Sequence, residues 1–316
     1  LLNALGSETA DAAGKPKTEK EEIKIDLDDM KDGLKSGIKD FARSMEGTIK
    51  SAMEGLKSLD LGNVVSSAFG SAKESVEKEL ILSADDVNSI ELRTGSGDIA
   101  VTGGGSGDVL IQAIITVRGS DDEDAKERAT QIEIVHSLED GVLKIKDSGS
   151  GRQITGPYSV DYRITVPSEM GVNLQTMDGD VSTKSIDGNV KINNYSGDIH
   201  LKSCTGHIKA NTKSGDIDVA ECSGTLNVKS LSGDLTFSEV TTDDLNCNTL
   251  SGDIEGTLRP NIGSNVNAKT LSGDIALKMP ETSSFSISAD TLSGSIDCEL
   301  PVSDASRSGH RVTAIL

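Results

Sequence analysis

The chain has 316 residues and a formal net charge of -20, from 51 acidic and 31 basic side chains. A surface with this charge repels anionic polymers, so nucleic acid is excluded as a partner of the molecule as a whole. Four Phe, three Tyr and no Trp leave few rings for base stacking or for the aromatic platforms of carbohydrate sites.

Residues 1–22 are predicted to be the end of a truncated N-terminal module followed by a linker. Residues 1–5 resemble the end of a helix that Gly6 stops, and residues 7–22 are rich in Ala, Lys, Glu and Thr. Because Leu1 is not an initiator methionine, we expect that an upstream segment has been removed, and a signal peptide or an anchor could have gone with it.

Residues 23–80 are predicted to form an amphipathic helical segment. Its apolar residues recur at spacings of three and four, which predicts a helix with an apolar stripe close to a heptad seam. The stripe comprises Leu27, Met30, Leu34, Ile38, Phe41, Met45, Ile49, Ala52, Leu56 and Leu59. A second, weaker stretch continues over residues 64–76 and is broken by Gly62 and Gly70.

The charged side chains of this segment leave two hypotheses open. Lys31, Lys35, Lys39 and Arg43 fall four residues apart, and cations beside an apolar stripe suit an anionic membrane surface. Acidic residues dilute this positive side, which favours a helix that packs on the rest of the chain or self-associates through its seam. In either case the segment is the predicted membrane- or partner-binding surface.

Residues 81–170 are predicted to form the opening coils and N-terminal cap of a repeat structure. Alternating apolar runs, typical of strands, occupy residues 90–92, 109–117, 132–135, 142–145 and 158–166. An acidic stretch, residues 121–128, predicts one short helix between them. A cap is expected because the open end of a solenoid is an unpaired sheet edge, and residues 312–316 are expected to close the opposite end.

Residues 171–316 carry the strongest signal, a repeated tetrapeptide of the form Ser-Gly-Asp-Ile. Its glycines are separated by 18, 18, 19, 21 and 21 residues, and they are Gly197, Gly215, Gly233, Gly252, Gly273 and Gly294. Self-similarity at this period predicts one supersecondary unit stacked on itself. Weaker glycine motifs halve the period, so each coil should contribute two strands. The prediction is a parallel β-helix with coils of 18–21 residues, right-handed by the general preference for such crossovers.

The strands and corners of these coils follow from the same pattern. Alternate apolar residues should face one core, among them Ile199, Leu201, Ile208, Ala210, Ile217, Val219, Leu226, Val228, Leu235 and Phe237. The residue before the motif serine is leucine in four successive coils, which predicts a further core column of Leu231, Leu250, Leu271 and Leu292. Glycine suits the corner because it adopts positive φ without steric cost, and neighbouring Ser and Asp can bond the turn amides.

Calcium binding is the functional alternative for the motif aspartates. Carboxylates repeat at Asp198, Asp216, Asp234, Asp253 and Asp274, and stacked carboxylates repel unless something neutralises them. The calcium-loaded nonapeptide repeat, however, has glycine pairs and an aspartate two places after the last glycine. Here a single glycine directly precedes each aspartate, which gives too few ligands per turn. The corner interpretation is therefore preferred, with no metal or other cofactor predicted.

The cysteines and histidines give little sign of a reactive centre. Cys204, Cys222, Cys247 and Cys298 show no Cys-x-x-Cys pairing and are interpreted as buried free thiols, which favours a cytoplasmic location. His200 and His207 fall on different strands of one coil, which makes them a weak metal pair at most. No run of 18 apolar residues predicts a membrane-spanning helix.

Two features together resemble a known family. The strand Tyr162-Arg163-Ile164-Thr165-Val166-Pro167, followed by repeated Thr-Leu-Ser-Gly-Asp-Ile, is similar to the bacterial putative-adhesin family of β-strand-repeat proteins, a domain of unknown function. The resemblance covers residues 85–316, and residues 1–5 resemble the tail of a SHOCT-like helical module. It implies a parallel β-helix without known catalysis, and some similar proteins act beside envelope-stress signalling systems and respond to membrane-active antibiotics.

The resulting functional hypothesis is a non-catalytic scaffold or interaction protein, cytoplasmic or peripheral to the cell envelope, with secretion left open. Its expected partner is a membrane surface, an antimicrobial peptide or an envelope-stress signalling protein. One alternative is a self-assembling, adhesin-like homo-oligomer. The other is a polysaccharide-active β-helix enzyme, which the short coils and the few aromatic residues disfavour.

Overall fold

The computed structural model describes residues 72–105, 107–151, 157–280, 285–299, 306–308 and 311–315. The expected linker and residues 23–71 of the expected amphipathic segment lie outside this part of the chain. The described residues form a β-solenoid of about 7 turns, which confirms the mainly-β solenoid of the predicted fold; the helix expected before it is not shown.

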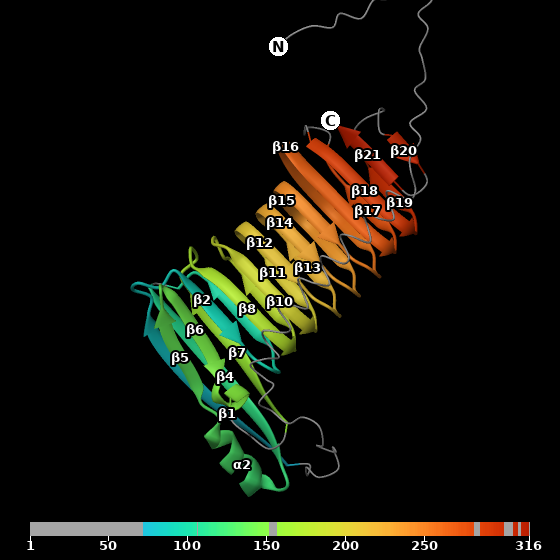
Figure 1. Ribbon diagram of the computed structural model, residues 1–316. Coiled ribbons are helices and arrows are strands. Elements are labelled where there is room, and N and C mark those ends of the chain that lie inside the picture. Colours follow the sequence, from blue (N-terminus) through green and yellow to red (C-terminus); the bar gives the residue numbers. More distant parts are fainter. Residues whose placement is uncertain are drawn as a thin grey trace, which may run out of the picture. The chain divides into compact units, whose positions relative to one another are not determined.

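Two stacks of strands build the solenoid, and the chain crosses from one stack to the other twice in each coil (Figure 1). The short-strand stack contains β3 (Ile99–Gly103), β9 (Val181–Lys184), β11 (Ile199–Lys202), β13 (Ile217–Ala220), β17 (Ile275–Lys278) and β19 (Ile296–Glu299). The long-strand stack contains β2 (Ser89–Arg93), β8 (Gly171–Asp178), β10 (Val190–Ser196), β12 (Thr205–Asn211), β14 (Ser223–Lys229) and β18 (Phe285–Ser293). Two longer strands, β15 (Leu235–Asn248) and β16 (Ile254–Ser272), belong to the short-strand stack in their first halves and to the long-strand stack in their second.

Parallel pairing in one register brings equivalent residues of successive coils together. Ile199 of β11, for example, pairs with Val181 of the coil before and with Ile217 of the coil after. The inward residues predicted from the sequence alternation are all buried, and they form one core between the two stacks. Coils stack at about 4.8 Å, so every inward column is a continuous row of apolar side chains.

Antiparallel strands close the first coils. In the short-strand stack, β3 pairs with β7 (Tyr158–Val166), β7 pairs antiparallel with β4 (Asp108–Gly119), and β4 pairs antiparallel with β1 (Ala72–Ser83). In the long-strand stack, β2 pairs with β6 (Val142–Asp147), and β6 pairs antiparallel with β5 (Ile134–Glu139). A 3-10 turn, η2 (Ser148–Gly151), follows β6.

Strand β1 corrects the sequence prediction, which placed residues 72–80 in the helical segment. Val76 and Leu80 are four apart, a spacing that fits one face of a helix and equally one side of a strand. The backbone pairs with β4 over its whole length, from Ala72 opposite Gly119 to Ser83 opposite Asp108. This long-range partner decides the conformation and cannot be read from the local pattern.

The edge at β1 carries an inward-facing charge. Lys78 lies on the side of β1 that also holds Val76 and Leu80, and its Nζ donates to the backbone oxygen of Ile132 at 2.6 Å. Inward charges on edge strands discourage pairing with another chain. The edge is therefore protected against end-to-end association through β1.

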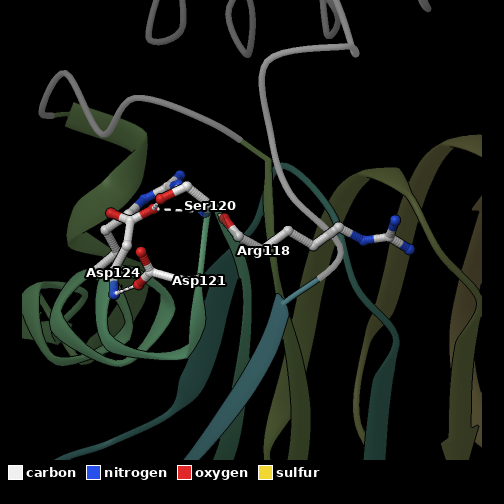
Figure 2. A network of polar contacts seen from close by, with 5 residues as sticks. Arg118, Ser120, Asp121 and Asp124 are labelled. Atoms are coloured by element: carbon white, nitrogen blue, oxygen red, sulfur yellow. Dashed lines mark hydrogen bonds and ion pairs between the residues drawn. The ribbon is translucent and has the colours of Figure 1, made fainter.

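The predicted short helix is confirmed as α2 (Asp122–Gln131). Figure 2 shows its N-terminus, where the Asp121 side chain accepts the amide of Asp124 at 2.9 Å and the Asp124 carboxylate accepts the amide of Ser120 at 2.8 Å. This reciprocal capping satisfies two amides, and the Ser120 amide is the main reason that the pKa of Asp124 is lowered. Arg128 Nη1 donates to the Arg118 oxygen at 2.7 Å, which ties the helix to β4.

The opposite end of the solenoid is covered by β21 (Arg311–Ile315), which pairs antiparallel with β18, and by β20 (Ser306–Ser308), which pairs antiparallel with β21. In the part of the chain that the structure describes, no helix has the length and apolar character needed to cross a membrane.

Candidate functional site

The Ser-Gly-Asp corner is the most repeated surface of the solenoid and holds the predicted site residues. Its glycines all have positive φ, from +113° at Gly197 to +155° at Gly273. A Cβ added at Gly233 would lie 2.0 Å from the Gly215 oxygen, and the equivalent positions in the other coils are as tight. Glycine is therefore required both by the backbone conformation and by the closeness of the preceding coil.

The motif aspartates form a ladder of hydrogen bonds between coils. Each Oδ1 accepts the backbone amide of the equivalent residue in the next coil, for example Asp198 Oδ1 from Asp216 at 2.8 Å. The same bond joins Asp161 to Asp98, Asp98 to Asp180, Asp180 to Asp198, Asp216 to Asp234, Asp234 to Asp253, Asp253 to Asp274 and Asp274 to Ser295, at 2.7–3.0 Å. This amide bond from Ser295, together with a side-chain bond, lowers the pKa of Asp274.

This ladder explains how stacked carboxylates coexist without a metal ion. A backbone amide faces each Oδ1 and stabilises its negative charge, so the aspartates act first as links between coils. Among the described residues, no group of three or more His, Cys, Asp or Glu side chains could hold a metal ion. The calcium alternative at these aspartates stays untested.

A column of buried hydroxyl groups lies behind the same corner and was not foreseen from the sequence. The side chains of Thr212, Ser230, Thr249, Thr270 and Thr291 are buried, and each donates to the carbonyl oxygen of a motif glycine. Asn194 fills this role in an earlier coil, with its Nδ2 at 2.9 Å from the Gly179 oxygen. The available signal was a Ser or Thr two residues before five of the six motif serines, with Asn194 before Ser196.

The leucine column is a correction to the sequence prediction, which placed it in the core. Leu231, Leu250 and Leu271 are only half-buried, and Leu292 is 37% exposed. The strand alternation explains this result, because the buried hydroxyl residue directly before each leucine already occupies the inward position. These leucines form a ridge on the outside of the long-strand stack.

The second corner of each coil holds two of the cysteines. Cys204 and Cys222 follow left-handed residues, Ser203 and Glu221, and stack in one inward column between Ile186 and Val240. The Cys204 amide donates to Cys222 Sγ at 3.4 Å. All four cysteines are free and buried, which confirms the interpretation as thiols.

Burial and mutual hydrogen bonding shift the pKa values of these thiols. Burial raises the pKa of Cys247 to about 12, so this group stays protonated at neutral pH. The hydrogen bond between the stacked thiols lowers the pKa of Cys204 and raises that of Cys222. The Sγ atoms of this pair contact the Thr183 hydroxyl and the backbone oxygens of Thr183, Lys202 and Ala220.

His200 and His207 do not come together. His200 Nδ1 lies 3.0 Å from Asp218 Oδ2 on the outside of the short-strand stack, whereas His207 is exposed on β12 in the long-strand stack. The weak metal pair considered from the sequence is therefore not assembled.

One buried polar cluster lies in the opening coils. Tyr158 donates its hydroxyl to Asp147 Oδ1 at 2.7 Å, and Asp147 is fully buried. Burial, with Asp147 nearby, raises the pKa of Tyr158 and of Tyr162. Both tyrosines are thereby kept neutral, which suits a structural role in the core.

The remaining predicted site residues lie outside the described part of the chain. They are the candidate membrane- or partner-binding residues Leu34, Ile38, Phe41, Met45, Ile49, Leu56, Lys31, Lys35, Lys39 and Arg43.

A family model described as Toastrack DUF4097 matches residues 57–255 and 222–314, most of the chain. The chain belongs to this family. The family resemblance predicted from the repeats is confirmed as the Toastrack family. The predicted SHOCT-like module is not shown by these comparisons. A search of curated proteins found no match.

Two solved structures are similar to this chain. A putative lipid binding protein from Parabacteroides distasonis is 17% identical, with a TM-score of 0.43 over 73% of this chain and 98% of that one. A putative adhesin from Bacteroides fragilis is 16% identical, with a TM-score of 0.39 over 72% of this chain and 97% of that one.

Proposed function

We propose that this Toastrack protein is a non-catalytic interaction protein associated with the cell envelope, in which the solenoid is a rigid scaffold for the amphipathic segment. The observation that carries the proposal is the aspartate ladder. The most repeated carboxylates, which could have served as acids, bases or metal ligands, each use one oxygen to join two coils. Together with buried thiols and dispersed histidines, this supports a scaffold in place of an enzyme.

The amphipathic segment supplies the interaction surface in this proposal. Its apolar stripe and its regularly spaced cations suit an anionic membrane surface, which we take as the partner. An antimicrobial peptide or an envelope-stress signalling protein is the alternative partner, and that role rests on the family resemblance alone. A self-assembling, adhesin-like role is the other alternative, and it would use the seam of the same segment.

The test is co-sedimentation of the full chain with anionic and neutral vesicles, with light scattering on the same samples. Substitutions are preferable to truncation, because a chain begun at residue 81 would lose most of β1 and its pairing with β4. The test variant replaces Leu34, Phe41 and Met45 with Glu. The matched control replaces Ser36, Ser44 and Ser51 with Glu, which gives the same charge change on the polar side.

Binding to anionic vesicles that the test variant loses and the control keeps is the expected result. Equal binding by both variants would overturn the membrane proposal. An oligomer that dissociates only in the test variant, without vesicle binding, would replace it with self-assembly.

A further inference from the structure

The outer side of the long-strand stack carries a row of lysine and asparagine side chains in direct register. Lys191 of β10 pairs with Asn173 of β8 on one side and with Lys209 of β12 on the other, and Lys209 pairs with Asn227 of β14. The residues on either side of each member along its strand, such as Val190 and Ile192, are buried in the core. The row Asn173, Lys191, Lys209 and Asn227, here named the lysine–asparagine row, therefore faces away from the core.

The two lysines of this row form a like-charge pair without compensation. Strands of adjacent coils are about 4.8 Å apart, and like charges directly opposite each other destabilise a sheet. Although the chain has 51 acidic residues, neither Lys191 nor Lys209 forms an ion pair within the described part of the chain. An anion bound across both ammonium groups would relieve the repulsion.

The short-strand stack provides a direct contrast. Lys184 and Lys202 are also in register there, but Lys202 Nζ lies 3.7 Å from Glu221 Oε1, and Ser203 donates to the same carboxylate at 2.8 Å. On that side the chain supplies its own anion. Stacked lysines in this protein can therefore have an acidic partner, and the two lysines of the lysine–asparagine row differ in having none among the described residues.

Asparagine amides flank the two lysines. The Oδ1 atoms of Asn173 and Asn227 and the Nδ2 of Asn193 are buried and have no partner among the described residues, so a ligand does not reach them directly. The Nδ2 groups of Asn173 and Asn227 are not among these buried atoms, and an amide N–H donates to a hydroxyl oxygen.

A third ammonium group belongs to Lys213, four residues after Lys209. Lys213 Nζ donates to the Tyr195 hydroxyl at 2.6 Å and lies 4.3 Å from the centre of its ring. Tyr195 follows Asn193 by two residues on β10 and so shares its side of the strand. The cations and amides therefore extend along the strand as well as across the coils.

We propose that the lysine–asparagine row binds an acidic polysaccharide. The ammonium groups pair with carboxylates of the sugar chain, and the asparagine amides pair with its hydroxyl groups. A linear polymer suits the row because both have chemical groups that recur along a line, and several weak contacts add up by multivalency. The net charge of -20 opposes the approach of a polyanion, but screening limits this repulsion to about 10 Å at moderate salt.

The inference does not depend on the amphipathic segment, and its test can succeed or fail independently of vesicle binding. The full chain is titrated with polygalacturonate, with neutral dextran and with poly-glutamate, at low and at physiological salt. Polygalacturonate should bind, dextran should not, and poly-glutamate should bind at least tenfold more weakly because it lacks hydroxyl groups. Equal affinity for poly-glutamate and polygalacturonate, or no binding of polygalacturonate, would overturn the proposal.

A pair of double variants locates the site. Lys191→Gln with Lys209→Gln should weaken polygalacturonate binding at least tenfold. The matched control, Lys184→Gln with Lys202→Gln, removes the same charge from an in-register pair on the other stack and should change binding less than twofold. Circular dichroism checks that both variants keep the fold, and equal losses in both would reduce the interaction to net charge and refute the assigned site.

Discussion

Both corners of each coil hold a residue at positive φ, but they differ in how many residue types they accept. At the Ser-Gly-Asp corner, glycine has positive φ and its Cα lies against the glycine oxygen of the previous coil, so no other residue fits. At the second corner, Ser185, Ser203, Glu221 and Glu239 adopt φ between +52° and +58° without such contact. The difference teaches that a sequence repeats strictly where steric exclusion acts, and loosely where only a conformational preference does.

The first prediction gives the largest effect, because it places a side chain in the strict corner. Gly233→Ala should lower the free energy of unfolding by about 3 kcal/mol or more, since the new Cβ meets the Gly215 oxygen. The measurement is urea denaturation followed by circular dichroism. Ser185→Gly at the second corner should change the free energy of unfolding by less than about 1 kcal/mol. Similar losses in both variants would remove the distinction between the corners.

The second prediction concerns the hydroxyl column behind the strict corner. Thr270→Val should lower the free energy of unfolding by about 1–3 kcal/mol, because the Gly252 oxygen loses a buried donor. Thr236→Val, on the exposed side of β15, keeps the same change of side chain without that loss and should be nearly neutral. A neutral Thr270 variant would mean that the carbonyl is satisfied by another group.

The third prediction uses the pH dependence of the aspartate ladder. The pKa of Asp274 is lowered in the folded protein, so its contribution to stability is present above the ordinary aspartate pKa and is lost as pH falls through the lowered value. Asp274→Asn should therefore flatten the loss of stability on acidification, measured by thermal melts between neutral and acid pH. Asp297→Asn, on the exposed side of β19, is the control. An unchanged acid profile in the Asp274 variant would argue against the ladder.

The fourth prediction gives the smallest effect and tests the outward ridge beside the strict corner. Leu250→Gln should change the free energy of unfolding by less than about 1 kcal/mol because the side chain is only half-buried. Leu245→Gln, five residues earlier in the core, places a polar group among apolar side chains and should cost several times as much. Thermal melts of the two variants provide the comparison. An equal loss of stability would mean that Leu250 contributes to the core as Leu245 does.

The strict corner also explains how much of the fold could be predicted from the sequence. The coil period, the two strands per coil and the inward residues such as Ile217 and Val219 follow from glycine spacing and alternation, which are local properties. The strand at residues 72–80 could not be predicted in this way, because its pairing with β4 joins residues more than 30 positions apart.

The candidate site was predictable to a lesser degree. The motif aspartates were recognised as corner residues, but their carboxylate-to-amide bonds depend on the distance between coils, which the sequence does not contain. Lys191 and Lys209 are 18 residues apart, which is one coil period, so their stacking follows from the repeat, whereas their lack of an acidic partner among the described residues required the structure. Leu231 and its equivalents were misplaced because their recurrence resembled a core column, whereas Ser230 and Thr249 occupy the inward positions.

The aspartate ladder also has a direction and an end. Every carboxylate serves only the coil that follows it, so each coil needs nothing from the molecule beyond its immediate neighbour. A coil duplicated between Asp216 and Asp234 would complete both contacts at once, and the protein could lengthen by copying without redesign of its core. At Ser295 the series lacks a carboxylate and therefore ends, in the coil whose long strand β18 pairs with antiparallel β21.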